Sequence, residues 1–420
     1  MSQPLPADDL PAVRPYRAVP PGLPTQTGPA GIRYDFNDGA RILLPPGDWH
    51  VELSDADTGN LLFTTDTREG WVLSGKKFLV RFVLRVWVKG EPSPCLEHEM
   101  SLENRPVRVH FPVGTLGDIL AWFPYLERFR QRYRGSVTYT MAEEIATLFS
   151  DTYPALVHVQ PDAPDDTLYA SYWLGLFFDD EGHSRQPVDF RMAGLNRTAG
   201  NILGVDNSEA RPNLKLDAPR TIAEPYVCIA VQASTQCKKW NNPAGWNDVV
   251  RHLKEKGYRV LCIDKDAVHG QTPAWTHLPR EAEDFTGERP LAERAALLQH
   301  ASAFVGVSSG LAWLAWACRI PTVLISGFTL PQNEFHTPYR VFNVHTCNGC
   351  WNDVRVRFDH HDFFWCPHHK GTPRQYECSA LITSLQVIKQ LDLALEESRW
   401  RQDAAHALPA SLRLACETQP

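Results

Sequence analysis

The sequence has no long, uninterrupted apolar run. Its most apolar stretch, residues 311–328, is broken by Arg319 and Pro321 and is too short to form a convincing membrane span. The N-terminal residues MSQPLPADDLPAVRPY contain no apolar segment of the kind that a secretory signal requires. We therefore expect no membrane insertion and a cytoplasmic location.

An excess of positive charge is also missing. The 420 residues include 42 Lys and Arg against 49 Asp and Glu, which gives a net charge of -7. This balance argues against a nucleic-acid partner and against binding to an anionic membrane surface. With 43% hydrophobic and 22% charged residues, the chain is typical of a globular protein, and its length predicts two or three domains.

Proline content and hydrophobic periodicity divide the chain into segments. Residues 1–30 hold eight of the 33 prolines and little apolar periodicity, which is typical of a flexible arm. The full predicted division is a Pro-rich arm (1–30), a β module (31–98), an N-terminal lobe (104–220), a C-terminal lobe (221–344), a four-cysteine insert (345–380), a C-terminal helix (381–405) and a tail (406–420).

The β module is predicted from a period of two. Between Phe78 and Val88, apolar residues occupy every second position, and Arg81, Arg85 and Lys89 fall on the opposite face. The turn signals PPGD, DADTGN and LSGK separate such runs. We expect a small antiparallel sheet.

From about residue 104 the pattern becomes strand, loop, helix, repeated. VRVHF (107–111) predicts a buried strand, and ILAWFPYLERFRQRY predicts the helix that follows it. A second series begins at YVCIAVQ (226–232) and continues to TVLIS (322–326). Two such series predict an α/β protein with two Rossmann-like lobes and a cleft between them.

Four of the ten cysteines lie within residues 347–378, as Cys347, Cys350, Cys366 and Cys378. In a reducing compartment this cluster favours a metal ion over disulfides, and four thiolates suit either zinc or iron. Four cysteine ligands leave no open position for water, so the ion is expected to be structural. Loss of one ligand should then disorder 345–380 and leave the rest in place.

Histidines accompany these cysteines, and they are candidate substitute ligands, neighbours of the ligands, or solvated side chains. They are His345, His360, His361, His368 and His369.

Three loops offer groups for a phosphate or a reacting hydroxyl. Ser309 and Gly310 open a helix after a strand, where backbone N–H groups bind either a diphosphate or an ordinary serine cap. Lys238 and Lys239 follow another strand, and a lysine there is either a phosphate partner or a surface charge. Asp118, at the start of the first helix, is either a helix cap or a general base.

Taken together, the loops GTLGDIL (114–120), KKWNNP (238–243) and VGVSSGLAWLAWA (305–317) resemble those of bacterial heptosyltransferases. The four-cysteine insert and the β module resemble the protein-modifying branch, the autotransporter heptosyltransferases. The likeness covers roughly residues 31–400.

The resemblance implies a GT-B glycosyltransferase fold and inverting transfer of heptose from ADP-heptose to Ser or Thr hydroxyls of an autotransporter adhesin passenger domain. Asp118 would be the general base and Lys238 would hold the ADP phosphates. The remaining donor-site residues that it implies are Thr115, Gly117, Arg294, Ser308, Ser309 and Gly310.

Two points of the resemblance need comment. Ser308 stands where lipopolysaccharide heptosyltransferases have an acidic residue, so the resemblance does not explain which residue binds the sugar hydroxyls. Arg294 is either a donor contact or part of a solvated helix face. The resemblance also implies that the ion is iron and that the chain forms a large homo-oligomer through the β module and the insert. Two other functions stay open: a heptosyltransferase for lipopolysaccharide core, and a non-catalytic metal-binding scaffold.

Overall fold

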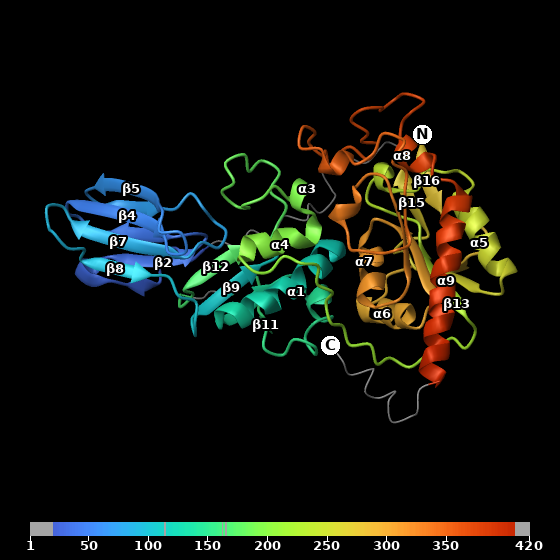
Figure 1. Ribbon diagram of the computed structural model, residues 1–420, viewed down its shortest axis with the longest axis horizontal. Coiled ribbons are helices and arrows are strands. Elements are labelled where there is room, and N and C mark those ends of the chain that lie inside the picture. The colour runs from blue at the N-terminus through green and yellow to red at the C-terminus, as the bar shows by residue number, and fades with distance from the viewer. Residues whose placement is uncertain (1–19, 113–114, 162, 164–165, 408–420) are drawn as a thin grey trace, which may run out of the picture.

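The computed structural model describes residues 20–112, 115–161, 163 and 166–407, with side chains described up to residue 401. Figure 1 shows a β module at one end, an α/β lobe in the middle and a second α/β lobe at the other end. The predicted loop residue Gly114, most of the predicted arm and most of the predicted tail lie outside the described residues.

The β module is built from two antiparallel groups of strands. One is a four-stranded sheet in the order β5-β4-β7-β8, and the other joins β2, β3 and β6. The strands are β2 (Arg33–Asn37), β3 (Arg41–Leu44), β4 (Trp49–Asp55), β5 (Leu61–Thr67), β6 (Gly70–Leu73), β7 (Phe82–Val88) and β8 (Leu96–Glu99).

The predicted alternation is present in β7, where Phe82, Leu84 and Val86 are buried and Arg85 pairs with Glu97 on the other face. The strand starts at Phe82, not at Phe78 as the pattern suggested. The preceding residues dock on the neighbouring lobe instead, because the N–H groups of Lys77 and Leu79 donate to the carbonyls of Ser184 and Ile202.

The N-terminal lobe contains a parallel sheet in the order β11-β10-β9-β12. Its strands are β9 (Pro106–His110), β10 (Ser136–Thr140), β11 (Val157–His158) and β12 (Ala170–Trp173). Its helices are α1 (Leu116–Tyr133), α2 (Glu143–Ala146), α3 (Phe190–Ala193) and α4 (Leu195–Leu203).

This sheet does not stop at the predicted boundary near residue 100. Strand β12 pairs in parallel with β2, so that β2, β3 and β6 extend the lobe's sheet into the β module. The end of the predicted arm is also ordered, since β1 (Gln26–Thr27) pairs with β2 and is followed by the 3-10 turn η1 (Pro29–Gly31). The module and the N-terminal lobe therefore share one eight-stranded sheet.

The C-terminal lobe is a six-stranded parallel sheet in the order β17-β14-β13-β18-β19-β20, as expected for a doubly wound fold. Residues 206–225, which hold no helix or strand, connect it to the first lobe. Its strands are β13 (Tyr226–Ala230), β14 (Arg259–Cys262), β17 (Glu283–Asp284), β18 (Ala303–Val307), β19 (Thr322–Ser326) and β20 (Arg340–Phe342).

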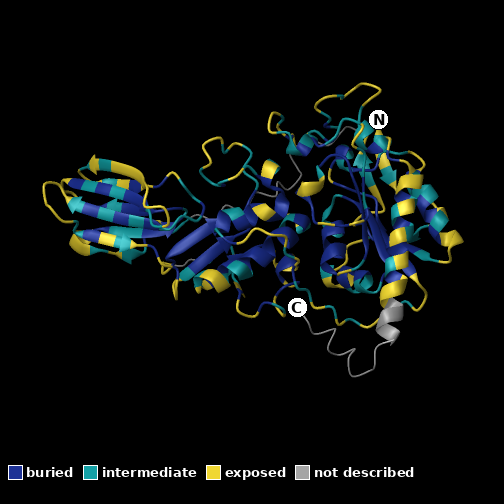
Figure 2. Ribbon diagram, viewed as in Figure 1, coloured by how far each residue is buried: buried dark blue, intermediate teal, exposed yellow. Residues whose placement is uncertain are grey.

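Helices cover this sheet, and a small hairpin projects beside it. The helices are α5 (Gly245–Glu255), α6 (Leu291–Gln299), α7 (Gly310–Ala317) and α9 (Ser384–Ala407), and the hairpin pairs β15 (Val268–Gln271) with β16 (Ala274–His277). Two 3-10 turns complete the lobe, η2 (Gln236–Lys238) and η3 (Pro331–Asn333). Figure 2 shows the strands of both lobes as buried.

The cysteine-containing segment has little regular structure, namely η4 (Cys350–Asn352) and α8 (Glu377–Ala380). Its apolar side chains form a small cluster with residues of both lobes: Phe190, Cys237, Phe328, Trp351, Phe358 and Trp365. The segment thus depends on the lobes for its core. No helix in the described part of the chain combines the length and the apolar character that crossing a membrane demands.

Candidate active site

A cleft of about 730 Å³ lies between the two lobes. The N-terminal lobe contributes the start of α1 and part of α2, and the C-terminal lobe contributes the loops after β13, β14 and β18. The lining residues are Leu116, Glu144, Ile145, Gln232, Ala233, Asp264, Lys265, Asp266, His269, Gly287, Glu288, Arg289, Pro290, Leu291, Arg294, Ser309, Gly310 and Leu311.

Two glycines allow the N-termini of α1 and α7 to meet beside this cleft. A Cβ on Gly117 would lie 2.8 Å from Cδ1 of Trp313, and a Cβ on Gly310 would lie 2.9 Å from Cβ of Leu116. Both distances are too short for real side chains, so any other residue would push the helices apart. The predicted residues Gly117 and Gly310 therefore set the spacing of the two lobes here.

Asp118 closes the first turn of α1. Its carboxylate accepts hydrogen bonds from the backbone N–H of Thr115 at 3.0 Å and from the Thr115 hydroxyl at 3.1 Å, in a capping-box arrangement. Burial raises the pKa of Asp118, while the bonds from Thr115 and the charge of Lys238 lower it. The side chain is only partly exposed, so a carboxylate with raised proton affinity lies at the junction of the lobes.

Ser308 and Ser309 connect β18 to α7, as predicted. Ser309 is the N-cap residue, yet its side chain makes no capping hydrogen bond. Its buried Oγ has no hydrogen-bond partner among the described residues, and neither has Nδ1 of His269, which also lines the cleft. Unpaired buried polar atoms in residues that line a cavity favour a polar ligand over simple helix capping.

The two adjacent lysines have different surroundings. The ammonium of Lys239 is buried and donates to the carbonyl of His269 at 3.1 Å and to Thr276 Oγ1 at 2.9 Å, which ties it to the β15–β16 hairpin. Burial lowers the pKa of Lys239 to about 8. Lys238 makes no such side-chain bond within the described residues, and its charge acts on Asp118. Of the pair, Lys238 is the one whose ammonium has no hydrogen-bond partner among the described residues.

Arg294 is buried, so the interpretation of it as part of a solvated helix face is wrong. Its guanidinium donates to the carbonyls of Ile263 and Asp264, just after β14, and of Gly287, just after β17. It also lines the cleft. Arg294 therefore supports the loop after β14 and presents positive charge to the cavity at the same time.

The sequence analysis missed several residues that line the cleft. Gln232 and Asp264 directly follow β13 and β14, and Asp264 accepts from the N–H groups of Val231 and Gln232. A signal for them existed, because ligands of doubly wound sheets bind at the carboxyl ends of the strands. By contrast, Asp118, Thr115, Gly117, Lys238 and Ser308 lie outside the set of described residues that line the cavity.

The cysteine segment converges on the end of β19. The N–H of Gly349, which has a left-handed φ of 67°, donates to the carbonyl of Gly327 at 2.9 Å. A Cβ on Gly327 would lie 2.6 Å from the carbonyl oxygen of Cys378, so only glycine admits that residue so closely. The turn that carries Cys347 and Cys350 and the helix that carries Cys378 thus meet at Gly327.

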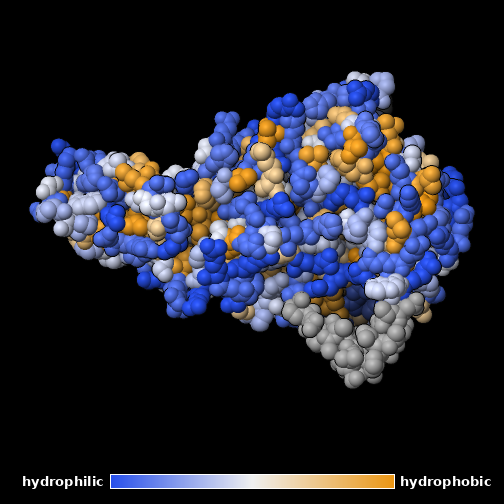
Figure 3. All heavy atoms as spheres, in the orientation of Figure 1, coloured by the Kyte–Doolittle hydropathy of each residue, from blue (hydrophilic) through white to orange (hydrophobic). Residues whose placement is uncertain are grey.

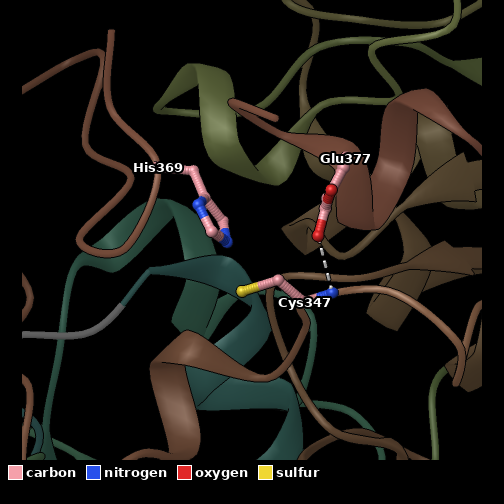
Figure 4. Close-up of side chains that lie close together, drawn as sticks. All are labelled: Cys347, His369 and Glu377. Atoms are coloured by element: carbon pink, nitrogen blue, oxygen red, sulfur yellow. Dashed lines mark hydrogen bonds between the residues drawn. The ribbon is translucent and has the colours of Figure 1, made fainter. Parts of the chain in front are cut away.

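The four thiols influence one another. Burial raises the pKa of Cys350, and the neighbouring Cys347, Cys378 and Cys366 raise it further. The closest set of candidate ligand atoms in the described chain is different, however: Cys347, His369 and Glu377 lie within 4.8 Å of one another (Figure 4). Glu377 is already bonded, since it accepts from the N–H of Cys347 and from Arg374.

Known proteins resemble this chain over nearly its whole length. Family profiles described as "Glycosyltransferase TibC, N-terminal domain" and "Glycosyltransferase family 9 (heptosyltransferase)" match residues 28–90 and 191–357. The autotransporter heptosyltransferase TibC of Escherichia coli O78:H11 is 55% identical over 383 residues, which cover 90% of this chain and 94% of TibC. This chain belongs to the autotransporter heptosyltransferase family.

Solved structures of the family agree with the fold. The crystal structure of TibC, described as an iron-containing dodecameric glycosyltransferase, matches with a TM-score of 0.88 and 54% identity over 90% of this chain and 99% of TibC. A second TibC structure, with ADP-D-β-D-heptose, matches equally well. These matches confirm the predicted GT-B-like α/β fold with its N-terminal β module.

One family member differs in activity. The protein BimC of Burkholderia thailandensis, named an inactive autotransporter heptosyltransferase, is 41% identical over 372 residues, 88% of this chain and 87% of BimC. The higher identity to TibC and the family 9 profile make this chain a glycosyltransferase of the heptosyltransferase type. They also favour a protein-modifying role over the lipopolysaccharide alternative.

Proposed function

We propose that this chain transfers heptose from ADP-heptose to Ser or Thr hydroxyls of an autotransporter adhesin passenger domain. The observation that carries the proposal is the meeting of α1 and α7 at the cleft, with the Asp118 carboxylate on one side and the unpaired Ser309 hydroxyl on the other. One side of this junction suits an acceptor hydroxyl, and the other suits a diphosphate.

The reaction needs one proton acceptor and one means of stabilising the leaving group. Asp118 accepts the proton of the acceptor hydroxyl while the oxygen of that hydroxyl forms a bond to the anomeric carbon of the heptose. The bond from that carbon to the diphosphate oxygen breaks in the same step, which inverts the configuration, and ADP leaves. The raised pKa of Asp118 brings its proton affinity closer to what a general base requires.

The leaving diphosphate gains negative charge, and three groups support it. The backbone N–H groups at the start of α7 have a favourable dipole for an anion. Lys238 supplies a positive charge, and Ser309 supplies a free hydroxyl donor. Thr115 and Gly117 keep α1 at the distance that this arrangement needs.

A metal ion fits the cysteine segment, and we propose that Cys347, Cys350, Cys366 and Cys378 hold it. The meeting of the Cys347–Cys350 turn with Cys378 at Gly327 and the effect of Cys347, Cys378 and Cys366 on the pKa of Cys350 support this ligand set, and Glu377 is occupied by Arg374. TibC is described as containing iron, which we adopt for this chain, with zinc as the alternative for the same thiolates. When bound, the ion supplies cross-links that the small apolar cluster lacks.

We propose a large homo-oligomer as well, because TibC is described as dodecameric. The β module carries exposed apolar side chains on its edge strands β5 and β6, namely Leu61, Phe63, Trp71 and Leu73. Figure 3 shows apolar surface between polar residues on this module. Exposed apolar edge strands favour association with another chain. We place the reaction in the cytoplasm, where the thiols stay reduced.

Incubation of the purified protein with ADP-heptose and a candidate adhesin passenger domain tests the proposal. We expect the acceptor to gain the mass of one heptosyl group at each modified hydroxyl, and ADP to appear in equal amount. The non-catalytic scaffold is the competing candidate, because BimC is named inactive. If several passenger domains show no mass gain and no ADP is released, the result would favour the scaffold.

A further inference from the structure

The ammonium of Lys238 lies among three aromatic rings. Its Nζ is 5.6 Å from the ring centres of Phe328 and Trp351 and 5.5 Å from that of Phe358. Phe328 follows β19, whereas Trp351 and Phe358 belong to the cysteine segment. We call these three rings the Lys238 cage.

These rings are the groups that contact the ammonium of Lys238 directly. Among the described residues, the Lys238 side chain has no hydrogen bond or ion pair. Burial lowers the pKa of Lys238, and Cys237, Asp118 and Glu334 act on it only through their charge. A lysine without hydrogen bonds has many rotamers, so an aromatic surround that attracts the cation restricts it to one place.

The cysteine segment also holds the backbone around Lys238. The N–H of Gln236 donates to the carbonyl of Phe363 at 2.9 Å, and Nδ2 of Asn241 donates to Ser379 Oγ at 2.9 Å. Nε1 of Trp240 donates to the carbonyl of Ile382, just beyond the segment, at 2.9 Å. Residues 236–241 are therefore fastened on both sides of Lys238.

The cage is attached to the N-terminal lobe too. Trp351 packs against Phe178 and Phe190, with ring centres 5.6 and 5.7 Å apart, and Nδ2 of Asn352 donates to the carbonyl of Arg191 at 2.7 Å. The segment thus contacts both lobes, and Figure 1 shows it between α3 and α8.

We infer that the cysteine segment is part of the donor site, with Trp351 and Phe358 as positioning residues for Lys238. This inference rests on the proposed role of Lys238 as the partner of the ADP diphosphate. It revises the expectation that loss of a cysteine ligand leaves the phosphate loops in place, because the contacts of 236–241 would be lost with the segment.

Titration calorimetry with ADP alone tests the inference on the metal-loaded, full-length protein. We expect Trp351→Leu and Phe358→Leu each to weaken ADP binding by about two- to thirtyfold, the range typical of a cation–π contact between exposed and desolvated limits. Trp351→Phe should restore most of the affinity. Trp365→Leu is the matched control, because Trp365 packs on Phe328 and Phe358 but not on Lys238.

A double-mutant cycle separates the hypothesis that Lys238 binds the diphosphate from the hypothesis that the Lys238 cage positions that lysine. If the cage acts through Lys238, Trp351→Leu should have no further effect on ADP binding in a Lys238→Ala background. An equal effect in both backgrounds would overturn the inference and leave the role of Lys238 intact. If Lys238→Ala alone binds ADP normally, the proposed role of Lys238 is wrong and the inference falls with it.

Metal content and melting temperature are measured on every variant. Phe358→Leu, which is farther from the cysteines in sequence, provides the test if Trp351→Leu does not fold. Weaker ADP binding at unchanged iron content supports the cage. Weakening that follows iron loss alone, and is shared by Trp365→Leu, overturns it.

Discussion

The N-termini of α1 and α7 meet at the cleft, but they are capped differently. The first turn of α1 is closed by Asp118, whose carboxylate accepts hydrogen bonds from the N–H and the hydroxyl of Thr115. At the start of α7, Ser309 occupies the capping position without capping. The difference teaches that residue types favoured at helix starts do not reveal which terminus is available for a ligand. In the proposed mechanism, the closed terminus carries the base, and the open one receives the anion.

Replacement of Asp118 by Asn should have the largest effect. The amide cannot accept the acceptor's proton, so we expect the transfer rate to fall by roughly 10²–10⁴-fold. Its oxygen can still accept from the N–H of Thr115, so folding and ADP affinity should persist. Initial rates and ADP calorimetry on one sample check this. Near-normal turnover would assign Asp118 to capping alone.

The pH dependence of kcat/KM gives the next largest effect. Asp118 must be ionised to act as a base, so the rate should fall about tenfold per pH unit below its pKa. Burial raises that pKa, so the acid limb should lie above the usual aspartate range. Because the charge of Lys238 lowers the pKa, Lys238→Ala should shift the limb to higher pH. A limb that stays fixed in this variant would show that the rate reports another group.

The spacing of the two termini can be tested with Gly117→Ala and Gly310→Ala. Each new Cβ would overlap a neighbour across the junction, Trp313 or Leu116 respectively. We expect overpacking to cost roughly 1–3 kcal/mol of unfolding free energy, with some loss of activity. Gly75→Ala is the control, since a Cβ there meets nothing within 4 Å. Thermal melts that show equal stability for all three variants would contradict the close packing.

The smallest effects should distinguish the two caps. Thr115→Ala loses a capping interaction and should cost about 0.5–1 kcal/mol of stability. Ser309→Ala removes an unpaired hydroxyl, so its stability should not fall, but ADP binding should weaken about two- to fivefold through loss of one neutral hydrogen bond. If Ser309→Ala destabilises the protein as much as Thr115→Ala and binds ADP normally, Ser309 is an ordinary cap.

Hydrophobic periodicity predicted the helices and strands whose own sequence shows a clear buried face. The βα units around β9, β13 and β18 follow from buried runs and helical patterns, and the positions of Asp118 and Ser309 at helix starts follow with them. The alternation in β7 was equally readable.

Residues whose role depends on distant chain segments could not be predicted. Nothing local to Trp351 or Phe358 shows that they surround Lys238, which lies more than a hundred residues away. The hydrogen bonds that occupy the ammonium of Lys239 come from the β15–β16 hairpin. The pairing of β12 with β2 was also invisible, because periodicity reports which face of a strand is buried and not its neighbour.

The pairing of β12 with β2 determines what can move. Backbone hydrogen bonds run without interruption from β11 to β6, so one continuous sheet joins the β2, β3 and β6 part of the β module to the N-terminal lobe. Residues 206–225 are the covalent connection between the N-terminal lobe and the C-terminal lobe. In an assembly held through the β modules, the acceptor side would stay fixed in the frame of the particle. Any movement of the C-terminal lobe relative to Asp118 would then have to break the contacts of the cysteine segment with Phe178, Phe190 and Arg191.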